Sequence, residues 1–150
     1  MGFILTEDTV GRILKNADAS IEMIKDMSKL PPDMIFSDTK TRMVFRYCFL
    51  VTIQAIFTMS NYLVVRKKLG IPKDYHESLM LLVEAKIINP KMEDVLGKLV
   101  GIRNLLLHEG VAITITNIKE ILEQTDNIIG IYNSVKSEVQ KSSMASESEG

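Results

Sequence analysis

Apolar residues recur every three to four positions along most of this chain, which is the period that predicts α-helices. The first expected helix spans residues 6–28, with Thr6 as its N-cap and Pro31-Pro32 beyond its end. Four more are expected from the same pattern and from capping residues: Ser37 to about Leu69, Asp74 to about Lys86, Pro90 to about Glu109, and Thr116 or Asn117 to about Val139. Gly70 and Gly110 are the expected stops of the second and fourth helices, and residues 111–115 alternate as an extended connector does.

The second expected helix is apolar on nearly every side. From Tyr47 through Val65 it carries 19 residues without a charge, which is long enough for a membrane span. Scattered polar residues such as Gln54 and Asn61, and the absence of a second such segment, argue against a membrane. A helix of this kind is buried on several sides, inside its own protomer and against a partner. The sequence therefore predicts an all-α, antiparallel up-and-down bundle of four to five helices that forms a homodimer.

Length and composition fit one soluble domain. The 150 residues are 46% hydrophobic and 25% charged, and we expect a helical domain over residues 1–140 with a disordered Ser/Glu-rich tail over 141–150. The net charge of −1 lacks the basic excess typical of nucleic-acid-binding domains, so any RNA site must be local. One cysteine, Cys48, excludes an internal disulfide and suits a reducing cytoplasm. Residues 1–5 are too short and uncharged for a signal peptide, and the expected location is cytoplasmic.

The segment from Gly101 to Gly110 holds the most informative polar residues. In a helix, Arg103 falls within an apolar stripe, where an unpaired charge would cost several kcal/mol or more. Gly97, Gly101, Asn104 and His108 form a neighbouring stripe at spacings of four, three and four, and its glycines favour close approach of another backbone. Either charged residue alone is more often structural, the arginine salt-bridged and the histidine a satisfied surface or core residue. Together with Asn104 they make a functional site about as probable as a structural one.

Few kinds of chemistry fit the remaining residues. Two histidines and one cysteine cannot supply a zinc site of usual spacing, and we expect no metal and no cofactor. Neither a phosphate-binding glycine loop nor a Ser-His-Asp pattern is present in the sequence. Acid–base chemistry by His108, with Arg103 holding a phosphate, is what remains. Those roles suit cleavage of an RNA phosphodiester by its own 2′-hydroxyl.

Arg103-Asn104-x-x-x-His108 resembles the Arg-x4-6-His signature of the HEPN superfamily. Further segments follow in the order and spacing of its HepT-like branch, so that the similarity spans roughly residues 40 to 110: Thr52-Ile53-Gln54-Ala55, Ser60-Asn61, Leu69-Gly70-Ile71-Pro72, Leu81-Leu82, Ile87-Ile88 and Leu99-Val100-Gly101-Ile102-Arg103-Asn104. The resemblance implies a metal-independent endoribonuclease that leaves a 2′,3′-cyclic phosphate and a 5′-hydroxyl. It also implies a composite site at a dimer interface, where Arg103 stabilises the phosphate, His108 is the acid or base and Asn104 orients them.

The same resemblance implies a partner. HepT-like proteins are typically toxins of type VII-like toxin–antitoxin pairs, encoded beside a minimal nucleotidyltransferase that acts as the antitoxin. Gly110 stands where the branch often carries a tyrosine that the partner modifies with AMP, and Thr58 stands where an acid is frequent. Thr58, Asn61 and Gly101 are the expected cleft-lining residues.

Two hypotheses about function follow. The preferred one is a homodimeric HepT-like toxin that cuts RNA with Arg103 and His108. The alternative is a non-catalytic helical dimer that binds a minimal nucleotidyltransferase, which Gly110, Thr58 and the near-neutral charge favour. A bundle in which the motif is only structural is a third, less favoured reading. Motif residues buried in mutual hydrogen bonds would favour binding alone.

Overall fold

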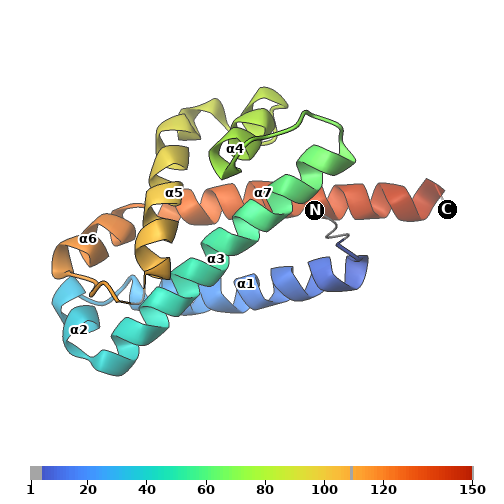
Figure 1. Ribbon diagram of the computed structural model, residues 1–150. Helices are drawn as coiled ribbons and strands as arrows, with labels where there is room; N and C mark the ends of the chain where they lie inside the picture. The colour runs from blue at the N-terminus through green and yellow to red at the C-terminus, as the bar shows by residue number, and fades with distance from the viewer. Residues whose placement is uncertain (1–4, 109, 150) are drawn as a thin grey trace.

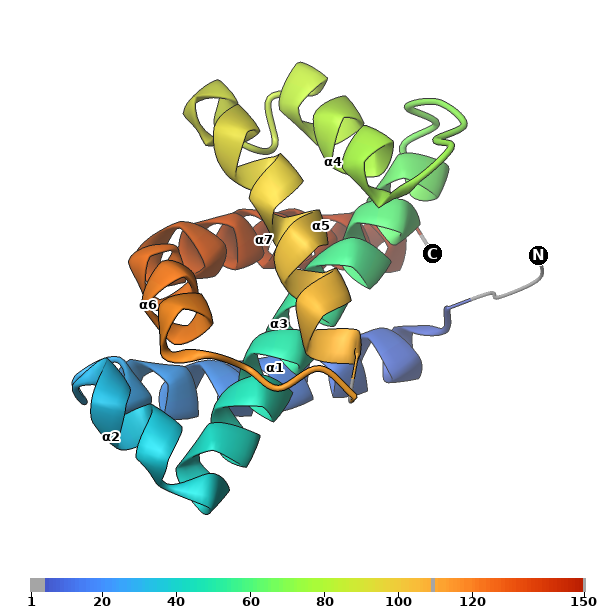
Figure 2. The same cartoon turned by 60° about the vertical axis from the view of Figure 1, so that its left-hand side comes forward.

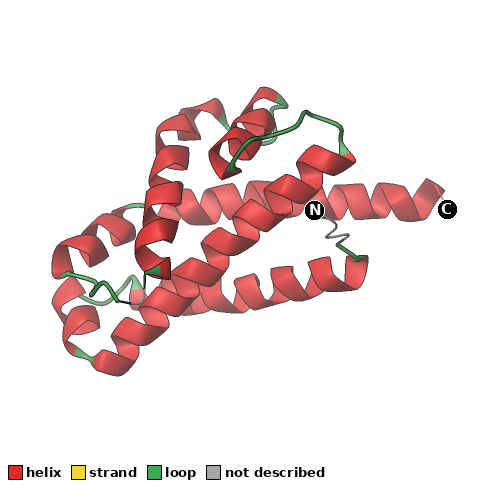
Figure 3. Ribbon diagram, viewed as in Figure 1, coloured by secondary structure: helices red, strands yellow, loops and turns green. Residues whose placement is uncertain are grey.

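The computed structural model describes residues 5–108 and 110–149, with side chains as far as Ser142. Within these residues the chain is helical and contains no β-strand (Figures 1 and 3). The elements are α1 (Glu7–Met27), α2 (Pro32–Ser37), α3 (Thr39–Arg66), α4 (Tyr75–Glu84), the 3₁₀ turn η1 (Pro90–Met92), α5 (Glu93–Leu107), α6 (Ile115–Glu123) and α7 (Thr125–Glu149). The all-α bundle is confirmed: four long helices, α1, α3, α5 and α7, carry it, and the short elements connect or cover them.

Helix α3 is the centre of the bundle. It crosses between α1 and α7 on one side and α4 and α5 on the other, while α2 packs near its start (Figures 1 and 2). Large side chains over more than half of its circumference are buried, among them Phe45, Phe49, Phe57 and Leu63, while the opposite face is half-buried or exposed. By length and composition alone this helix could cross a membrane, but most of its apolar stretch is buried among the other helices. The predicted burial of the uncharged segment inside its own protomer is thus found for most of its length, and its burial against a partner stays a prediction.

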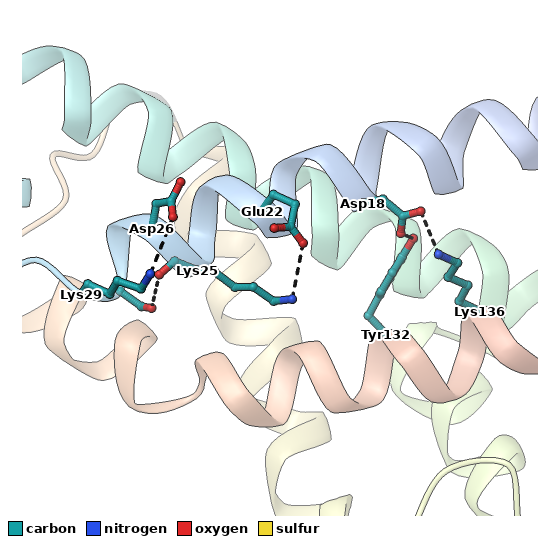
Figure 4. Close-up of polar contacts among 8 residues, drawn as sticks. Asp18, Glu22, Lys25, Asp26, Lys29, Tyr132 and Lys136 are labelled. Carbon is teal, nitrogen blue, oxygen red and sulfur yellow. Dashed lines mark hydrogen bonds and ion pairs between the residues drawn. The ribbon is translucent and has the colours of Figure 1, made fainter.

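A buried polar contact joins α1 to α7. The Tyr132 hydroxyl donates to Oδ1 of Asp18 at 2.7 Å and lies 3.1 Å from the carbonyl oxygen of Leu14, while Lys136 Nζ lies 2.8 Å from Oδ2 of Asp18 (Figure 4). Burial, and then the hydrogen bond and charge of Asp18, raise the pKa of the Tyr132 phenol well above its ordinary value. The network fixes the register of the first helix against the last.

Several helix ends lie where the sequence predicts them, and others do not. Thr6 and Asp74 cap α1 and α4 as expected. The predicted cap Ser37 instead ends the short helix α2, in a segment expected to be a loop, and Asp38 caps α3 through the backbone N–H of Thr41. Pro32 favours a first helical turn because its missing N–H is not needed there.

The end of α3 also differs from the prediction. The helix stops at Arg66, and Lys68 rather than Gly70 takes the left-handed position that follows its C-cap, with φ of 54°. The N–H of Lys68 bonds to the carbonyl of Val65 and that of Leu69 to Val64, so orphan carbonyls are satisfied without a glycine. Gly70 lies two residues further on, with φ of 151°.

The predicted last helix is divided into two. Thr114 and Asn117 form a capping box at the start of α6, two to three residues earlier than expected, and the chain turns at Gln124 before α7. The turn lets α6 pack on α2 while α7 packs on α1 and α3, which one straight helix could not do. Helix α7 then continues to Glu149, through the segment predicted to be disordered. That segment has neither proline nor glycine before Gly150, so the helix that begins in the core is not interrupted there.

Candidate functional site

Helix α5 presents one apolar face to the bundle and one open face. Val95, Leu96, Leu99 and Leu106 are buried, whereas Leu107 at the end of the helix is 40% exposed. Gly97, Gly101 and Asn104 lie exposed on the other side. A Cβ atom added at either glycine would meet nothing within 4 Å among the described residues. The predicted close approach of a second backbone is therefore not made within the protomer.

Arg103 is the motif side chain that other helices of the protomer hold in place. Its Nε donates a 2.9 Å hydrogen bond to Oε1 of Gln54 on α3. Its guanidinium carbon lies 5.1 Å from the ring centroid of Tyr75 and 5.9 Å from that of Phe57, and these two rings stack on each other at 4.7 Å. Among the described residues the charge is thus paired with an amide and two aromatic faces rather than with a carboxylate.

The arrangement leaves the outer part of the guanidinium free. Nη1 and Nη2 of Arg103 make no hydrogen bond or ion pair to any residue that the structure describes. An arginine held through Nε and stacked on rings keeps a planar pair of N–H donors for a ligand, which is the geometry that binds phosphate. Gln54 and Tyr75 were not predicted as site residues; the polar Gln54 inside the uncharged segment was the available signal.

His108 lies just beyond α5 and not within it. The helix was expected to reach Glu109, but it ends at Leu107, and His108 is the C-cap residue with φ −81° and ψ 87°. His108 therefore does not continue the helical stripe of Gly97, Gly101 and Asn104. Its side chain is exposed and forms no hydrogen bond with the described residues. Asn104 is also exposed, so the motif residues are not locked in mutual hydrogen bonds.

An unpredicted residue, Arg46 of α3, holds the backbone around His108. Its Nη1 donates to the carbonyl oxygens of Leu106 at 3.1 Å and His108 at 3.3 Å, and its Nη2 donates to that of Val111 at 2.8 Å. Arg46 is the last charge before the uncharged segment, which is the only sign of it in the sequence. It lines a groove of about 870 Å³ with Tyr47, Leu107 and other residues of α3 and the 111–116 segment.

The two residues of α3 expected in the cleft have different surroundings. Asn61 accepts a hydrogen bond from the Ser78 hydroxyl of α4 through Oδ1, at 2.5 Å, and lines a hollow of about 480 Å³ together with Tyr75. Thr58 is half-buried one residue after Phe57. Tyr75 thus links the Asn61 hollow to the Arg103 side chain.

The other candidate groups stay apart from the motif. His76 is exposed at the start of α4. Cys48 is buried in α3, and burial raises the pKa of its thiol, an effect partly offset by a hydrogen bond involving Ser20. Among the described residues no three His, Cys, Asp or Glu side chains gather as a metal site requires.

Comparison with known proteins bears on this geometry. The family described as Ribonuclease HepT-like matches residues 8–136. This chain belongs to the HepT-like ribonuclease family. It is 27% identical over 101 residues to the mRNA nuclease HepT of Shewanella oneidensis, a match that covers 67% of this chain and 70% of that one.

Solved structures give the same fold for this HepT-like chain. A toxin–antitoxin complex with AMP-PNP aligns with a TM-score of 0.72 and 17% identity, over 87% of this chain and 99% of that one. A tri-AMPylated Shewanella oneidensis HEPN toxin in complex with MNT antitoxin aligns with a TM-score of 0.71 and 17% identity, over 88% and 99% of the two chains. The bundle is therefore the HepT fold, and the family named from the motif and its ordered flanking segments is confirmed.

Proposed function

We propose that this protein is the toxin of a toxin–antitoxin pair and cuts RNA without a metal, using Arg103 and His108. The observation that carries the proposal is the state of Arg103, which is fixed through Nε by Gln54 while its outer N–H groups make no hydrogen bond or ion pair with the described residues. The exposed imidazole of His108 follows at the end of the same helix. The family and the mRNA nuclease of Shewanella oneidensis support the same activity.

The chemistry needs only these groups and the substrate. A base removes the proton of a ribose 2′-hydroxyl, the 2′-oxygen attacks the neighbouring phosphorus, and the bond to the 5′-oxygen breaks as an acid protonates that oxygen. The products are a 2′,3′-cyclic phosphate and a 5′-hydroxyl. Arg103 binds the non-bridging phosphate oxygens, whose negative charge grows in the transition state, and Asn104 orients the pair. His108 serves as acid or base because imidazole titrates near neutral pH.

A homodimer completes the proposed site. One protomer offers a single imidazole near the phosphate-binding arginine, whereas two protomers offer two, one for each proton transfer. The exposed face of Gly97, Gly101 and Asn104 has room for a second chain, since nothing in the described protomer covers it. Measurement of mass in solution tests this: a protein that stays monomeric at working concentration and still cleaves RNA contradicts the composite site.

The proposed partner is a minimal nucleotidyltransferase acting as antitoxin, and the proposed place of action is the cytoplasm, where mRNA is found. Relatives of this fold have been solved as toxin–antitoxin complexes, one of them tri-AMPylated and bound to MNT antitoxin. In this chain Gly110, which has no hydroxyl, stands at the position where HepT-like proteins often carry a tyrosine that the partner modifies with AMP. Gly110 is also the observation that favours the second candidate function, a non-catalytic dimer that binds such a partner.

Cleavage in EDTA separates the two functions. We expect purified wild type to cut single-stranded RNA in EDTA, and Arg103→Ala and His108→Ala each to reduce the rate by about 100-fold or more. His76→Ala is the matched control, because it removes the other exposed histidine and leaves the motif intact. RNA with a 2′-deoxyribose at the cut position should resist. Wild-type protein that leaves varied RNAs intact would exclude the enzyme and leave the binding function.

A further inference from the structure

The carboxyl end of α5 lacks the usual means of satisfying its carbonyl groups. The last four carbonyls of any α-helix have no partner within the helix, and they form its negative pole. Helices α1, α3 and α4 each receive a hydrogen bond from the backbone N–H of their own C-cap residue. At α5 no such bond from His108 is found within the described residues, and the last turn contains no basic residue. A donor from outside the helix can therefore serve one of these carbonyl groups.

Arg46 of α3 is such a donor, because it bonds to the carbonyl of Leu106. The guanidinium reaches the carbonyl of Leu106 before His108, the carbonyl of His108 itself and the carbonyl of Val111 after it. The N–H of Val111 also donates to the carbonyl of His108, at 3.0 Å. One cation therefore fixes the backbone on both sides of the proposed catalytic histidine, across 60 to 65 residues of sequence.

The support for this cation is rigid. Arg46 is half-buried, and its neighbours Phe45 and Cys48 are completely buried in the core. Arg42 lies one turn earlier on α3 and lines the same groove, but it donates to the carbonyl of Phe36 and stacks on that ring at 5.5 Å. The two arginines thus make similar contacts to different segments: Arg42 holds α2, and Arg46 holds the His108 segment.

We infer that Arg46 is a positioning residue for His108, which sets where the imidazole stands relative to Arg103. The inference rests on the proposed ribonuclease function. Small displacements of a proton-transferring group lower rates steeply, and His108 lies beyond the last helical residue, where α5 itself no longer fixes the backbone. A lysine cannot replace Arg46, because one compact ammonium does not offer two forked nitrogens to three separate carbonyls.

The test compares Arg46→Lys with Arg42→Lys in the full-length protein, using a fluorogenic single-stranded RNA in EDTA. We expect Arg46→Lys to lower kcat about 10- to 100-fold while KM stays within about twofold, since the effect acts on geometry and not on phosphate binding. Arg42→Lys should keep the wild-type kcat, whatever it does to Tm. Arg46→Gln is the second variant, and circular dichroism and solution mass are measured for all three.

Imidazole NMR signals supply an independent readout. The protein has only two histidines, so His76 on α4 is an internal reference. We expect Arg46→Lys and Arg46→Gln to shift or broaden the His108 signals and leave those of His76 unchanged, whereas Arg42→Lys should change neither. If Arg46 contributed only to general stability, both Arg46 variants would have a lower Tm, while kcat and the His108 signals of the folded protein would stay unchanged.

The outcomes separate the two proposals. An inactive wild type overturns the proposed function, and with it the catalytic meaning of the Arg46 contacts. An active wild type together with Arg46 variants of full kcat and unchanged His108 signals overturns only the positioning role. If both Arg46 variants lose helicity, the role is also overturned, since Arg46 would then be a general structural residue.

Discussion

The Nε of Arg103 donates a 2.9 Å hydrogen bond to Oε1 of Gln54, 49 residues earlier in the chain. Gln54 is a half-buried polar residue in a helix whose neighbouring positions are mostly apolar and buried. The hydrogen bond therefore gives the half-buried amide a partner, and it holds the arginine charge at the surface of the core. It also orients Arg103 without neutralising it.

Under the proposed ribonuclease function, Gln54→Leu should weaken RNA cleavage. Loss of a hydrogen bond to a charged group is worth about 1.5–3 kcal/mol, so we expect kcat/KM to fall about tenfold or more. Gln54→Glu is the comparison variant: it keeps an oxygen acceptor at the same place but adds a negative charge that offsets the charge of Arg103, so it should restore only part of the rate lost in Gln54→Leu. Equal activity of wild type and Gln54→Leu would show that Arg103 is positioned in some other way.

The ring of Tyr75 should matter more than its hydroxyl. The guanidinium of Arg103 lies 5.1 Å from this ring, and a partly exposed cation–π contact is worth about 0.5–1 kcal/mol. We expect Tyr75→Ala to reduce kcat/KM about two- to fivefold and Tyr75→Phe to leave it unchanged. A loss in Tyr75→Phe comparable to that in Tyr75→Ala would instead point to the hydroxyl.

The Tyr132 hydroxyl should contribute to stability and not to activity. Tyr132→Phe removes the hydrogen bonds to Leu14 and Asp18 that join α7 to α1, and we expect the free energy of unfolding to fall by about 1–2 kcal/mol. Urea unfolding measures this. Tyr47→Phe is the control, because Tyr47 is 56% exposed and should be nearly neutral for stability. A neutral Tyr132→Phe would mean that the network adds nothing to the packing of the ring.

Cys48 should make stability decrease in alkaline solution. Burial raises the pKa of its thiol above the ordinary value of 9.0, so the folded protein keeps this proton to higher pH than the unfolded chain does. Its contribution is complete below pH 9.0 and is lost as the pH rises towards the folded pKa. Urea titrations of wild type and Cys48→Ala between pH 7 and pH 10 check this. The free energy of unfolding of the wild type should fall relative to that of Cys48→Ala as the pH rises. Iodoacetamide should also react slowly with the folded protein and rapidly in urea.

Lys86 should be replaceable by glycine with a gain in stability. It has φ of 64° after α4, and its N–H and that of Ile87 return to Val83 and Leu82 as in a Schellman end. Glycine adopts this conformation without a steric penalty, so we expect Lys86→Gly to raise the free energy of unfolding by about 0.5–1 kcal/mol. Ala85→Gly, one residue earlier at a negative φ, should instead destabilise the protein. Thermal unfolding of the pair tests the sign.

The sequence by itself determined the features that depend on neighbouring residues. Helical period, caps such as Thr6 and Asp74, and the burial of the uncharged segment are local properties, because side chains three and four residues apart share a helix face whatever surrounds them. The order of the motif segments also sufficed to name the family. The need of Arg103 for a partner followed from the same local reasoning.

Only the tertiary structure decided which partners meet. Gln54 and Tyr75 contact Arg103, and Arg46 contacts the residues around His108, because α3 crosses α4 and α5 at particular places along their lengths. Crossing positions depend on how whole helix surfaces pack, which no local period specifies. The end of α5 at Leu107 and the turn at Gln124 have the same origin. In both places the helical pattern continues in the sequence. The Arg46 hydrogen bonds favour a different backbone path after Leu107, and the packing of α6 on α2 and of α7 on α1 and α3 favours the turn at Gln124.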